Sequence, residues 1–503
     1  MTNITDRRLI VGMEVHVELA TRSKMFTPAA NVAHPSNFDA EPNTLCDPVS
    51  IALPGALPTM NHDALEMAML VGMAINCEIA DQCQWDRKNY FYPDLPKGYQ
   101  ISQYEHPICG KGHMMIEGLN GPISIGITRA HLEEDTGKSG HELPGGREID
   151  GSIVDYNRAG TPLLEIVTEP DITSAADAVT FGRELRAICR ALGVTEGIMQ
   201  KGHMRFEPNI NLALTLEDGT EVRTPIAEIK NLNSFRAVEQ SIQYEMKRQE
   251  SQWLEDGIEM GPGVKSTRGW DERKGQTVLQ RSKEDAHDYR YFPEPDLVPL
   301  TIDESWKQII QARLPELPMA RRARWTTDLG LTAKDAAALA EDPPTADFFE
   351  ACAAVMVAGG MDDTQAAQAA AKLLLNAGAR EANERSCSIE ALGITPEQVA
   401  ALALMRQEGD LGSTAVDELF IVLCDVDETA RDAADRLGLV QVSDAGALDS
   451  WIDQAVEAHP QATEDFAAGK DAAMGRIMGH VMKASGGSAD AGKVRARLIE
   501  RLR

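Results

Sequence analysis

Short runs of alternating apolar and polar residues characterise the first 300 residues of the chain. V-G-M-E-V-H-V-E-L (11–19) and S-I-G-I-T-R-A-H-L (124–132) have the two-residue period that is typical of strands. Helical spacing interrupts these runs at 61–77, 174–192 and 235–254. The segment 174–192 begins with a serine that can cap a helix, and such a serine directly precedes 235–254. The pattern therefore predicts a mixed α+β sheet domain.

Beyond P-E-P-D-L-V-P-L (293–300) the composition changes to Ala, Leu, Glu and Asp, with little strand-like alternation. This predicts a mainly α-helical C-terminal half, broken at Pro343-Pro344 and Gly359-Gly360. Between residues 473 and 484 a methionine-rich stripe has helical spacing, which favours a buried helix face over a cofactor site. The predicted fold class is α+β, with a mixed sheet domain followed by helices.

The bulk composition indicates a folded, multidomain protein. At 503 residues, with 43% hydrophobic and 25% charged residues, the chain is expected to form about two to four domains. We expect a cytoplasmic location and no membrane, because no apolar run approaches the ~18 residues of a membrane span and no signal peptide begins the chain. The eight scattered cysteines include no C-x-x-C pair, which favours reduced thiols over disulfides or a zinc finger.

The net charge of -29 argues against a general nucleic-acid binder, because it repels polyanions at long range. RNA could bind only at local basic patches. The sequence offers Arg321, Arg322 and Arg324, and near its end Lys493, Arg495, Arg497, Arg501 and Arg503. For each patch an ordinary solubilising surface is the alternative interpretation.

Two acid-rich fragments are candidates for chemistry. H-L-E-E-D (131–135) places three carboxylates beside a histidine, and these repel one another unless a cation or water neutralises them; a solvated loop is the alternative. Glu14 and His16 lie two apart on a predicted strand, so both face one side. Together the fragments would form an oxygen-rich site with imidazole, suited to magnesium and a nucleotide phosphate.

Two further segments combine aromatic rings with both charge signs. The first, 85–103, contains Arg87, Lys88, Asp94 and Lys97 and fits an interface or a polar conduit, between which the spacing does not decide. The second, 281–296, fits a surface network or a phosphate or RNA contact. Neither a P-loop nor a G-x-G-x-x-G after a strand is present.

Long motifs in these same segments resemble the B subunit of the aspartyl/glutamyl-tRNA(Asn/Gln) amidotransferases. The resemblance covers nearly the whole chain. Its motifs are S-K-M-F (23–26), A-E-P-N-T (40–44), L-P-G-A-L-P (53–58), R-K-N-Y-F-Y-P-D-L-P-K-G-Y-Q-I-S-Q (87–103), H-L-E-E-D-T-G-K (131–138), D-Y-N-R-A-G-T-P-L-L-E-I-V-T-E-P-D-I (155–172), E-I-K-N-L-N-S-F (228–235), D-Y-R-Y-F-P-E-P-D-L (288–297) and M-G-H-V-M-K-A-S (478–485).

The resemblance implies a cradle-like catalytic domain (1–298), a helical linker domain (299–405) and a helical tail domain that contacts tRNA (406–503). It also implies that ATP phosphorylates the side-chain carboxylate of Glu-tRNA(Gln) or Asp-tRNA(Asn), and that ammonia from a partner amidase then displaces phosphate. A carboxylate needs this activation because its oxygen is a poor leaving group. The implied partners are an amidase (A) subunit, a small C subunit and the charged tRNA, and the implied cofactors are ATP and Mg²⁺.

The resemblance also assigns roles to individual residues. Glu14, His16 and Glu134 match active-site positions, and the magnesium set adds Glu133 and Asp135. Arg205 and Glu207 match nucleotide-binding positions, and Lys88, Tyr90 and Asp94 lie in the segment associated with the ammonia path.

The chain departs from the family pattern at two places. Thr27, Ala29, Asp47 and Ser50 stand where many members carry zinc-binding cysteines, so we expect no zinc there. M-Q-K-G-H-M-R-F-E (199–207) replaces the usual M-E-E-G-S-L-R-C-D, so Gln200 and Lys201 replace two acids. These changes favour an alternative function, a tRNA-binding scaffold without phosphoryl transfer, whereas the retained acidic cluster favours the enzyme. A third possibility, an amide ligase for small acids, would need its own ammonia source, and no amidase-like Ser-Ser-Lys set is present.

Overall fold

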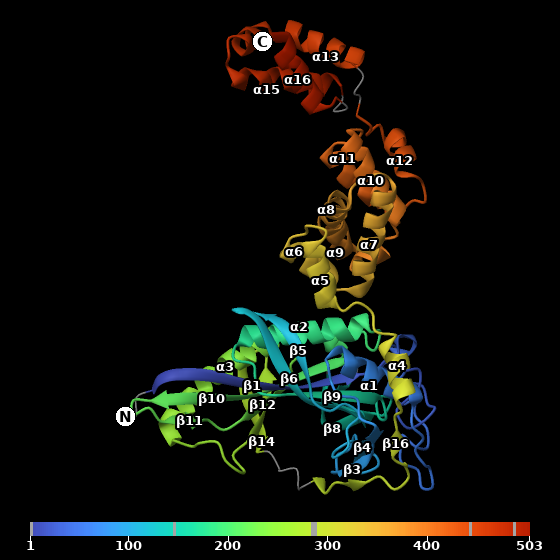
Figure 1. The fold of residues 1–503 in the computed structure, drawn as a ribbon, viewed down its shortest axis with the longest axis vertical. Helices are drawn as coiled ribbons and strands as arrows, with labels where there is room; N and C mark the ends of the chain where they lie inside the picture. Colours follow the sequence, from blue (N-terminus) through green and yellow to red (C-terminus); the bar gives the residue numbers. More distant parts are fainter. Residues whose placement is uncertain (1–3, 144–146, 283–288, 442–444, 486–488, 503) are drawn as a thin grey trace. The chain divides into compact units, whose positions relative to one another are not determined.

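The computed structural model describes residues 4–143, 147–282, 289–441, 445–485 and 489–502. It forms two compact units, Met1–Pro318 and Met319–Arg503, which are described separately. The first is a mixed sheet domain and the second is helical (Figure 1), so the α+β prediction is confirmed. The three-domain division at residues 298 and 405 stays a prediction.

A large mixed sheet forms the centre of the first unit. Its strands lie in the order β14-β13-β12-β10-β1-β9-β6-β5, and β11 pairs with β10. All neighbours are antiparallel except β12 and β13. The bounds are β1 Ile4–Glu18, β5 Gly112–Gly118, β6 Gly121–Glu134, β9 Pro162–Thr168, β10 Met204–Leu216, β11 Glu221–Arg223, β12 Ala227–Lys230, β13 Ser266–Asp271 and β14 Gln276–Ser282.

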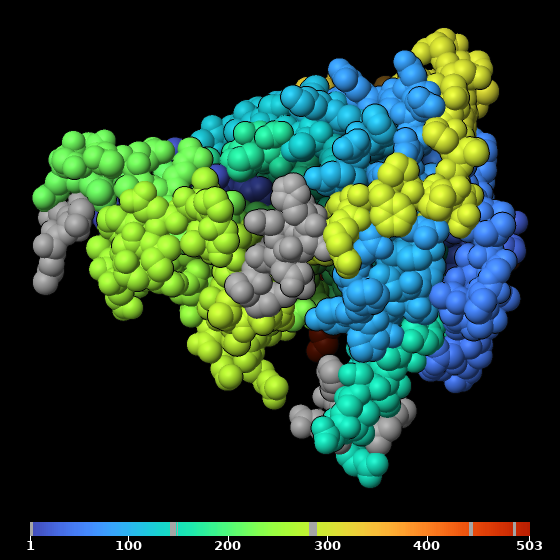
Figure 2. All heavy atoms as spheres, turned by 90° about the horizontal axis from the view of Figure 1, so that it is seen from below, coloured from blue at the N-terminus to red at the C-terminus, as the bar shows by residue number. Residues whose placement is uncertain are grey.

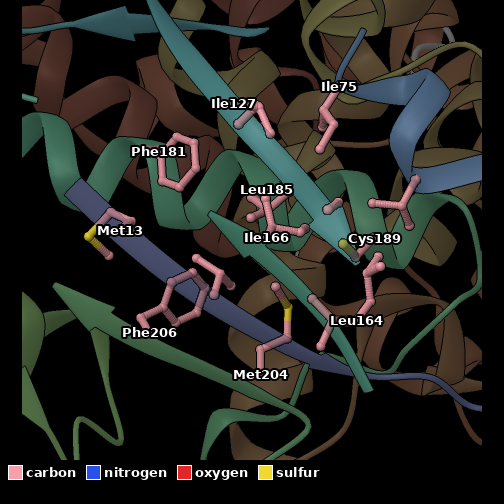
Figure 3. Close-up of a cluster of buried hydrophobic side chains, with 14 of the residues drawn as sticks. Met13, Ile75, Ile127, Leu164, Ile166, Phe181, Leu185, Cys189, Met204 and Phe206 are labelled. Carbon is pink, nitrogen blue, oxygen red and sulfur yellow. The ribbon is translucent and has the colours of Figure 1, made fainter. Parts of the chain in front are cut away.

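Three helices pack against this sheet: α1 (His62–Ala74), α2 (Ala175–Ala191) and α3 (Phe235–Asp256). Their positions agree with the sequence prediction. The residue before each helix, Asn61, Ser174 or Ser234, caps it by accepting a hydrogen bond from a first-turn amide. On α2, the buried Phe181, Leu185 and Cys189 follow one another at spacing four. They face Met13, Ile166 and Phe206 of the sheet, and this contact forms the core of the unit (Figure 3).

Smaller elements surround the sheet. A three-stranded sheet joins β15 (Phe292–Pro293), β3 (Asp86–Asn89) and β4 (Tyr99–Ser102), and two-stranded pairs join β16 (Leu300–Thr301) to β2 (Gln82–Cys83) and β7 (Lys138–Leu143) to β8 (Arg147–Asp155). Two 3-10 turns, η1 (Pro35–Asn37) and η2 (Met199–Lys201), lie in connections, and α4 (Glu304–Gln311) packs against α1.

An ion pair holds the segment directly after β15 to β3. Arg87 Nε donates to Glu294 Oε2 at 2.7 Å, and Arg87 Nη2 donates to Oε1 at 2.8 Å. The Glu294 side chain is fully buried, so its charge depends on this two-point contact.

The second unit contains two apolar cores. The first core includes Trp325 and Phe349, and the second includes Ile452 and Phe466. The helices are α5 Pro318–Thr327, α6 Ala333–Ala340, α7 Pro343–Ala358, α8 Asp363–Leu373, α9 Ala379–Arg385, α10 Pro396–Glu408, α11 Ser413–Leu423, α12 Ala430–Leu437, α13 Ala445–Ala458, α14 Pro460–Ala467, α15 Met474–Ala484 and α16 Ala491–Leu502, with short turns at Leu374–Gly378, Ile389–Leu392 and Asp471–Ala473.

The predicted helix breaks and the methionine-rich stripe are confirmed. Helix α7 begins at Pro343, where a proline costs no helical hydrogen bond, and it ends before Gly359. On α15, Met474, Ile477 and Val481 are buried. Within the described part of the chain, no helix has the length and apolar character needed to cross a bilayer.

The predicted basic patches of the second unit make ion pairs with neighbouring acids. Arg321 and Arg324 both contact Glu350, and Arg497 and Arg501 both contact Asp449. Arg503 lies outside the described residues. All eight cysteines are free, as the sequence predicts.

Candidate active site

Strand alternation separates the core from a polar face of the central sheet. In β1, Met13, Val15 and Val17 are buried among apolar side chains, while Glu14 and His16 point to the opposite face. In β10, Arg205 and Glu207 alternate in the same way with buried neighbours. The predicted shared face of Glu14 and His16 is confirmed, and it lies opposite the core.

The register of the strands brings distant residues into rows. His16 lies opposite Arg205 on one side and Glu165 on the other, and Glu165 lies opposite His131. Two residues along β1, Glu14 lies opposite Glu207. Because β9 separates β1 from β6, the two sequence fragments 11–19 and 131–135 meet through Glu165.

This face forms the floor of a cavity of about 890 Å³. In Figure 2 an opening in the first unit lies between light-blue segments, which precede residue 100, and the yellow-green segments that follow α3. The polar residues that line the cavity include Glu14, His16, Lys88, Tyr90, Asp94, Glu133, Asp135, Glu165, Arg205, Glu207, Glu228, Lys230 and Arg290.

The first cluster of possible metal ligands is His16, Glu133 and Glu165, whose ligand atoms lie within 4.8 Å of one another. His16 Nε2 lies 3.5 Å from Glu165 Oε2, and His131 Nε2 lies 3.4 Å from the same oxygen. Lys88 Nζ lies 4.0 Å from Glu133 Oε2, an oxygen that has no hydrogen-bond partner within the described ranges. Glu133 Oε2 is therefore available to contact a group bound at this cluster.

Burial and charge set different protonation states for the two histidines. Burial opposes the charged form of His16, but the adjacent Glu165 raises its pKa above the ordinary value. Burial lowers the pKa of His131 to about 4, so this ring is neutral at pH 7. Burial would raise the pKa of Glu165, yet the two histidines and Lys88 hold it well below its ordinary value. Glu165 is thus the fixed negative charge of the cluster.

The second cluster is Glu14, Glu207 and Glu228, also with ligand atoms within 4.8 Å. Lys230 Nζ contacts Glu207 at 2.5 Å and Glu228 at 3.0 Å, and Asn209 Nδ2 donates to Glu14 Oε1 at 2.8 Å. The two clusters together place five carboxylates on one face, against Lys88 and Lys230. This excess of oxygen ligands and negative charge suits a divalent cation.

Asp135 lies at the edge of the cavity between two arginines. Arg205 Nη2 contacts Asp135 Oδ2 at 2.7 Å, and Arg158 Nε lies 3.5 Å from it. Although burial disfavours the ionised carboxylate, these cations hold its pKa at about 2. Burial and the charge of Asp135 raise the pKa of the neighbouring Glu18 to about 8, so Glu18 holds a proton at neutral pH and bonds to Asp135.

This pair predicts a pH-dependent contribution to stability. The pKa of Glu18 is about 8 in the folded chain, above its ordinary 4.5, so the folded state retains a proton that the unfolded state releases. The stabilisation is complete below pH 4.5 and is lost as the pH rises through 8, with a slope of at most about 1.4 kcal/mol per pH unit. Glu18→Gln should flatten the unfolding free energy, measured in urea, between pH 5 and 8.5. The exposed Glu105→Gln serves as control; an unchanged slope in Glu18→Gln would contradict the assignment.

Glu134 lies apart from the two clusters. It directly follows Glu133 on β6, so its side chain points to the other side of the strand. Its carboxylate contacts Lys97 and accepts a hydrogen bond from the amide of Ile101 at 3.0 Å. The three consecutive carboxylates are therefore not gathered in one place, because strand alternation and the arginines near Asp135 separate them. A role for Glu134 in the reaction stays a prediction.

The residues predicted for an ammonia path lie at one side of the same cavity. Lys88 is half-buried, with Nζ 5.3 Å from the centroid of Tyr289, and the nearby Glu133 raises its pKa against the effect of burial. The hydroxyl of Tyr90 donates to Gln100 Oε1 at 3.1 Å. Asp94 also lines the cavity. The structure thus brings all three to the cavity of His16, while their role stays a prediction.

A hydrogen-bonded cluster occupies Thr27, Ala29, Asp47 and Ser50, the positions at which the resemblance implies zinc-binding cysteines in other members. Thr27 Oγ1 donates to Asp47, which accepts from the Ser50 amide at 2.9 Å. The amide of Ala29 donates to Thr27 Oγ1 at 3.3 Å. Hydrogen bonds from Thr27 and Ser50 to the Asp47 carboxylate thus hold together the loop that contains these residues.

Sequence reasoning did not find Glu165, Glu228 or Lys230. Each is a polar residue within a short apolar strand, P-L-L-E-I-V-T for Glu165 and A-E-I-K for the other two. A buried acid in a strand is a usable signal, because ionised side chains are rarely buried without a partner. Their partners, however, follow from strand order, which one sequence does not reveal.

Two family models match this chain. Residues 9–308 match the GatB/GatE catalytic domain, and residues 348–502 match the GatB domain. The chain thus belongs to the class of proteins that combine these two GatB domains.

Full-length relatives narrow this class. The B subunit of the aspartyl/glutamyl-tRNA(Asn/Gln) amidotransferase from Burkholderia ambifaria is 42% identical over 99% of this chain and 100% of its own length. Proteins of the same name from Bacillus cereus and Caldanaerobacter subterraneus are each 41% identical, covering 98% and 96% of both chains. The chain belongs to the family of aspartyl/glutamyl-tRNA(Asn/Gln) amidotransferase B subunits.

Proposed function

We propose that this chain uses ATP to activate the side-chain carboxylate of Glu-tRNA(Gln) or Asp-tRNA(Asn), so that ammonia can convert it to the amide. The observation that carries the proposal is the cavity of the first unit, where five carboxylates, His16, Lys88 and Lys230 meet on a rigid sheet face. Phosphoryl transfer requires positioning and charge compensation rather than a protein nucleophile, and this arrangement supplies both. The names of its relatives support the tRNA-dependent amidotransferase activity.

Magnesium fits the residues that are present. Glu14, Glu207 and Glu228 offer oxygen ligands, and His16, Glu133 and Glu165 offer an adjacent mixed set. When bound, the ion would neutralise the phosphate charge of ATP. Arg205 and Lys230 would hold phosphate oxygens, because both cations line the cavity next to the acids. Glu207 would orient Lys230 through their ion pair.

We also propose that Lys88, Tyr90 and Asp94 form the entry for ammonia, delivered by an amidase (A) subunit that assembles with this chain and a small C subunit. Neutral ammonia travels best along groups that exchange hydrogen bonds, and these residues line one side of the cavity that holds Glu133. The tRNA would bring its amino-acid ester to the same cavity.

The decisive experiment measures ATP hydrolysis by the assembled complex with magnesium, with and without misacylated tRNA. We expect hydrolysis only with Glu-tRNA(Gln) or Asp-tRNA(Asn), together with a phosphorylated aminoacyl intermediate when glutamine is omitted. Failure with both tRNAs would favour the scaffold function that Gln200 and Lys201 suggest. Turnover without any tRNA would favour a ligase for small acids.

We propose further that the loop near Thr27 works without zinc, because Thr27, Asp47 and Ser50 replace metal bonds by hydrogen bonds. Metal analysis of the purified chain should find less than about 0.1 zinc per molecule, since a four-ligand site needs thiolates or imidazoles that these positions lack. Stoichiometric zinc that survives dialysis against a chelator would contradict this proposal.

A further inference from the structure

A separate cavity of about 320 Å³, which we call the α3 cavity, lies where the C-terminal half of α3 meets β13 and β14. It shares no described lining residue with the candidate active-site cavity. Along β13, Ser266 and Arg268 line the α3 cavity, whereas Thr267 between them lines the active-site cavity. Because alternate residues of a strand point to opposite faces, the two cavities lie on opposite sides of this strand.

Apolar side chains form much of the lining of the α3 cavity, among them Trp253, Ile258, Val264 and Leu279. Ile258 is 46% and Leu279 is 58% exposed, so both offer apolar surface that a ligand can cover. Trp253 is 8% exposed, and its Nε1 has no hydrogen-bond partner within the described ranges. A buried donor without a partner costs free energy that a ligand oxygen can recover.

Two arginines in the wall of the α3 cavity share one buried carboxylate. Arg248 Nη2 contacts Glu245 Oε2 at 2.7 Å, and Arg268 Nε lies 3.4 Å from Glu245 Oε1. The Glu245 side chain is fully buried, while both arginine side chains keep some exposure. Burial and the charge of Arg248 lower the pKa of Arg268, against the effect of Glu245. Glu245 therefore leaves one positive charge of this pair uncompensated.

Lys265 and Asp256 complete the charges of the lining. Lys265 lines the cavity, and its Nζ lies 4.0 Å from Glu228 Oε2. Asp256, the acid among the described lining residues, is exposed near the end of α3 and accepts a hydrogen bond from the Ile258 amide at 2.9 Å. Water screens an exposed carboxylate. The α3 cavity is thus locally positive, in a chain whose net charge is -29.

These features match a small molecule that joins one negative charge to an apolar body. A carboxylate accepts charge-assisted hydrogen bonds from guanidinium and ammonium groups. An apolar body would cover Trp253 and Leu279, which line the same space. A purely apolar molecule would bury the cations without an acceptor, and a dianion would exceed the single uncompensated charge of the arginine pair.

We propose that the α3 cavity binds a small carboxylate with an apolar body about the size of an indole ring. Arg268 and Lys265 hold the carboxylate, and Trp253 and Leu279 cover the body. Because β13 separates the two cavities, this ligand and ATP bind independently. The inference does not rest on the proposed activation of the aminoacyl carboxylate, which uses the opposite face of the sheet.

The test measures binding to the assembled complex by calorimetry with three probes, indole-3-acetate, the uncharged indole-3-acetamide, and acetate. Indole-3-acetate should bind with a Kd of about 0.1–1 mM, as its size allows. The acetamide should bind at least about tenfold more weakly because it lacks the charge, and acetate at least about tenfold more weakly because it lacks the ring. Saturating ATP with magnesium should change the Kd of indole-3-acetate by less than about twofold.

Two variants, each with a matched control, locate the probe. Leu279→Asp places a negative charge in the lining and should raise the Kd of indole-3-acetate at least about tenfold. Val278→Asp alters the preceding exposed residue of β14, whose side chain points to the other face, and should raise it less than about threefold. Lys265→Gln should raise the Kd about fivefold. Lys247→Gln removes an exposed charge of α3 outside the α3 cavity and should change it less than about twofold.

Several results would overturn this assignment. The first is no binding of indole-3-acetate up to about 5 mM, and the second is equal binding of the acid and the amide. Displacement of the probe by ATP would place it in the active-site cavity instead. Equal losses in Leu279→Asp and Val278→Asp would show that the probe does not occupy the α3 cavity. Hydrolysis of ATP with misacylated tRNA tests the proposed function independently of all these results.

Discussion

Glu165→Gln should lower the rate of tRNA amidation by at least about 100-fold, the range found when one preorganised electrostatic group is removed from a site. Glutamine has nearly the same size as glutamate, but it removes the negative charge that His16 and His131 both face at about 3.5 Å. It also removes one carboxylate from the cluster that could hold magnesium. The measurement is kcat and KM of the assembled complex with Glu-tRNA(Gln), ATP and glutamine.

The exposed Glu169, four residues further along the chain, provides a matched control. Glu169→Gln makes the same chemical change outside the cavity and should keep the wild-type rate. Glutaminase activity of the complex should survive in both variants, because it belongs to the partner amidase. A Glu165→Gln complex within about threefold of the wild-type rate would remove Glu165 from the active site.

Arg87→Met should destabilise the first unit by about 3–5 kcal/mol, because it leaves the fully buried carboxylate of Glu294 without its partner. Methionine keeps much of the apolar stem of arginine, so the loss of stability comes mainly from removal of the positive charge. Urea denaturation followed by tryptophan fluorescence measures the change, since the buried Trp85 directly precedes β3.

The double variant Arg87→Met/Glu294→Met should recover most of this stability, because two apolar side chains replace the ion pair. Arg7→Met serves as the control for removing an arginine from an exposed ion pair. Arg7 pairs with Glu250 at the surface, and its side chain is 49% exposed, so the loss should stay below about 1 kcal/mol. A single variant at Arg87 that loses less than about 1 kcal/mol would show that Glu294 does not depend on this partner.

The elements of the fold were largely predictable because their signals are local. The predicted cap residues Ser174 and Ser234 mark helix starts wherever those helices finally pack. The alternation in 11–19 likewise gives the two faces of β1 without knowledge of its neighbours. Strand order is different, because β1 pairs with β9 and β10 through contacts between residues more than 140 positions apart.

The candidate site was predictable only in part for the same reason. Glu14 and His16 share a face by simple alternation, and that expectation is confirmed. In 131–135 the letters place Glu133 and Glu134 side by side, but the strand turns them to opposite sides, so only Glu133 reaches His16. Glu165 completes the cluster through register, which the sequence does not contain.

Strand β1 contributes one face to the core and the other to the cavity, and this limits which sequence changes the strand can accept. Thirteen residues of β10 pair with β1. Strand β1 alone carries Met13 and Val15 into the core and Glu14 and His16 into the cavity. Inserting or deleting one residue would turn the acid and the imidazole inward and the apolar side chains to water. Natural diversity in this strand should therefore arise by exchange of side chains, never by a change of length.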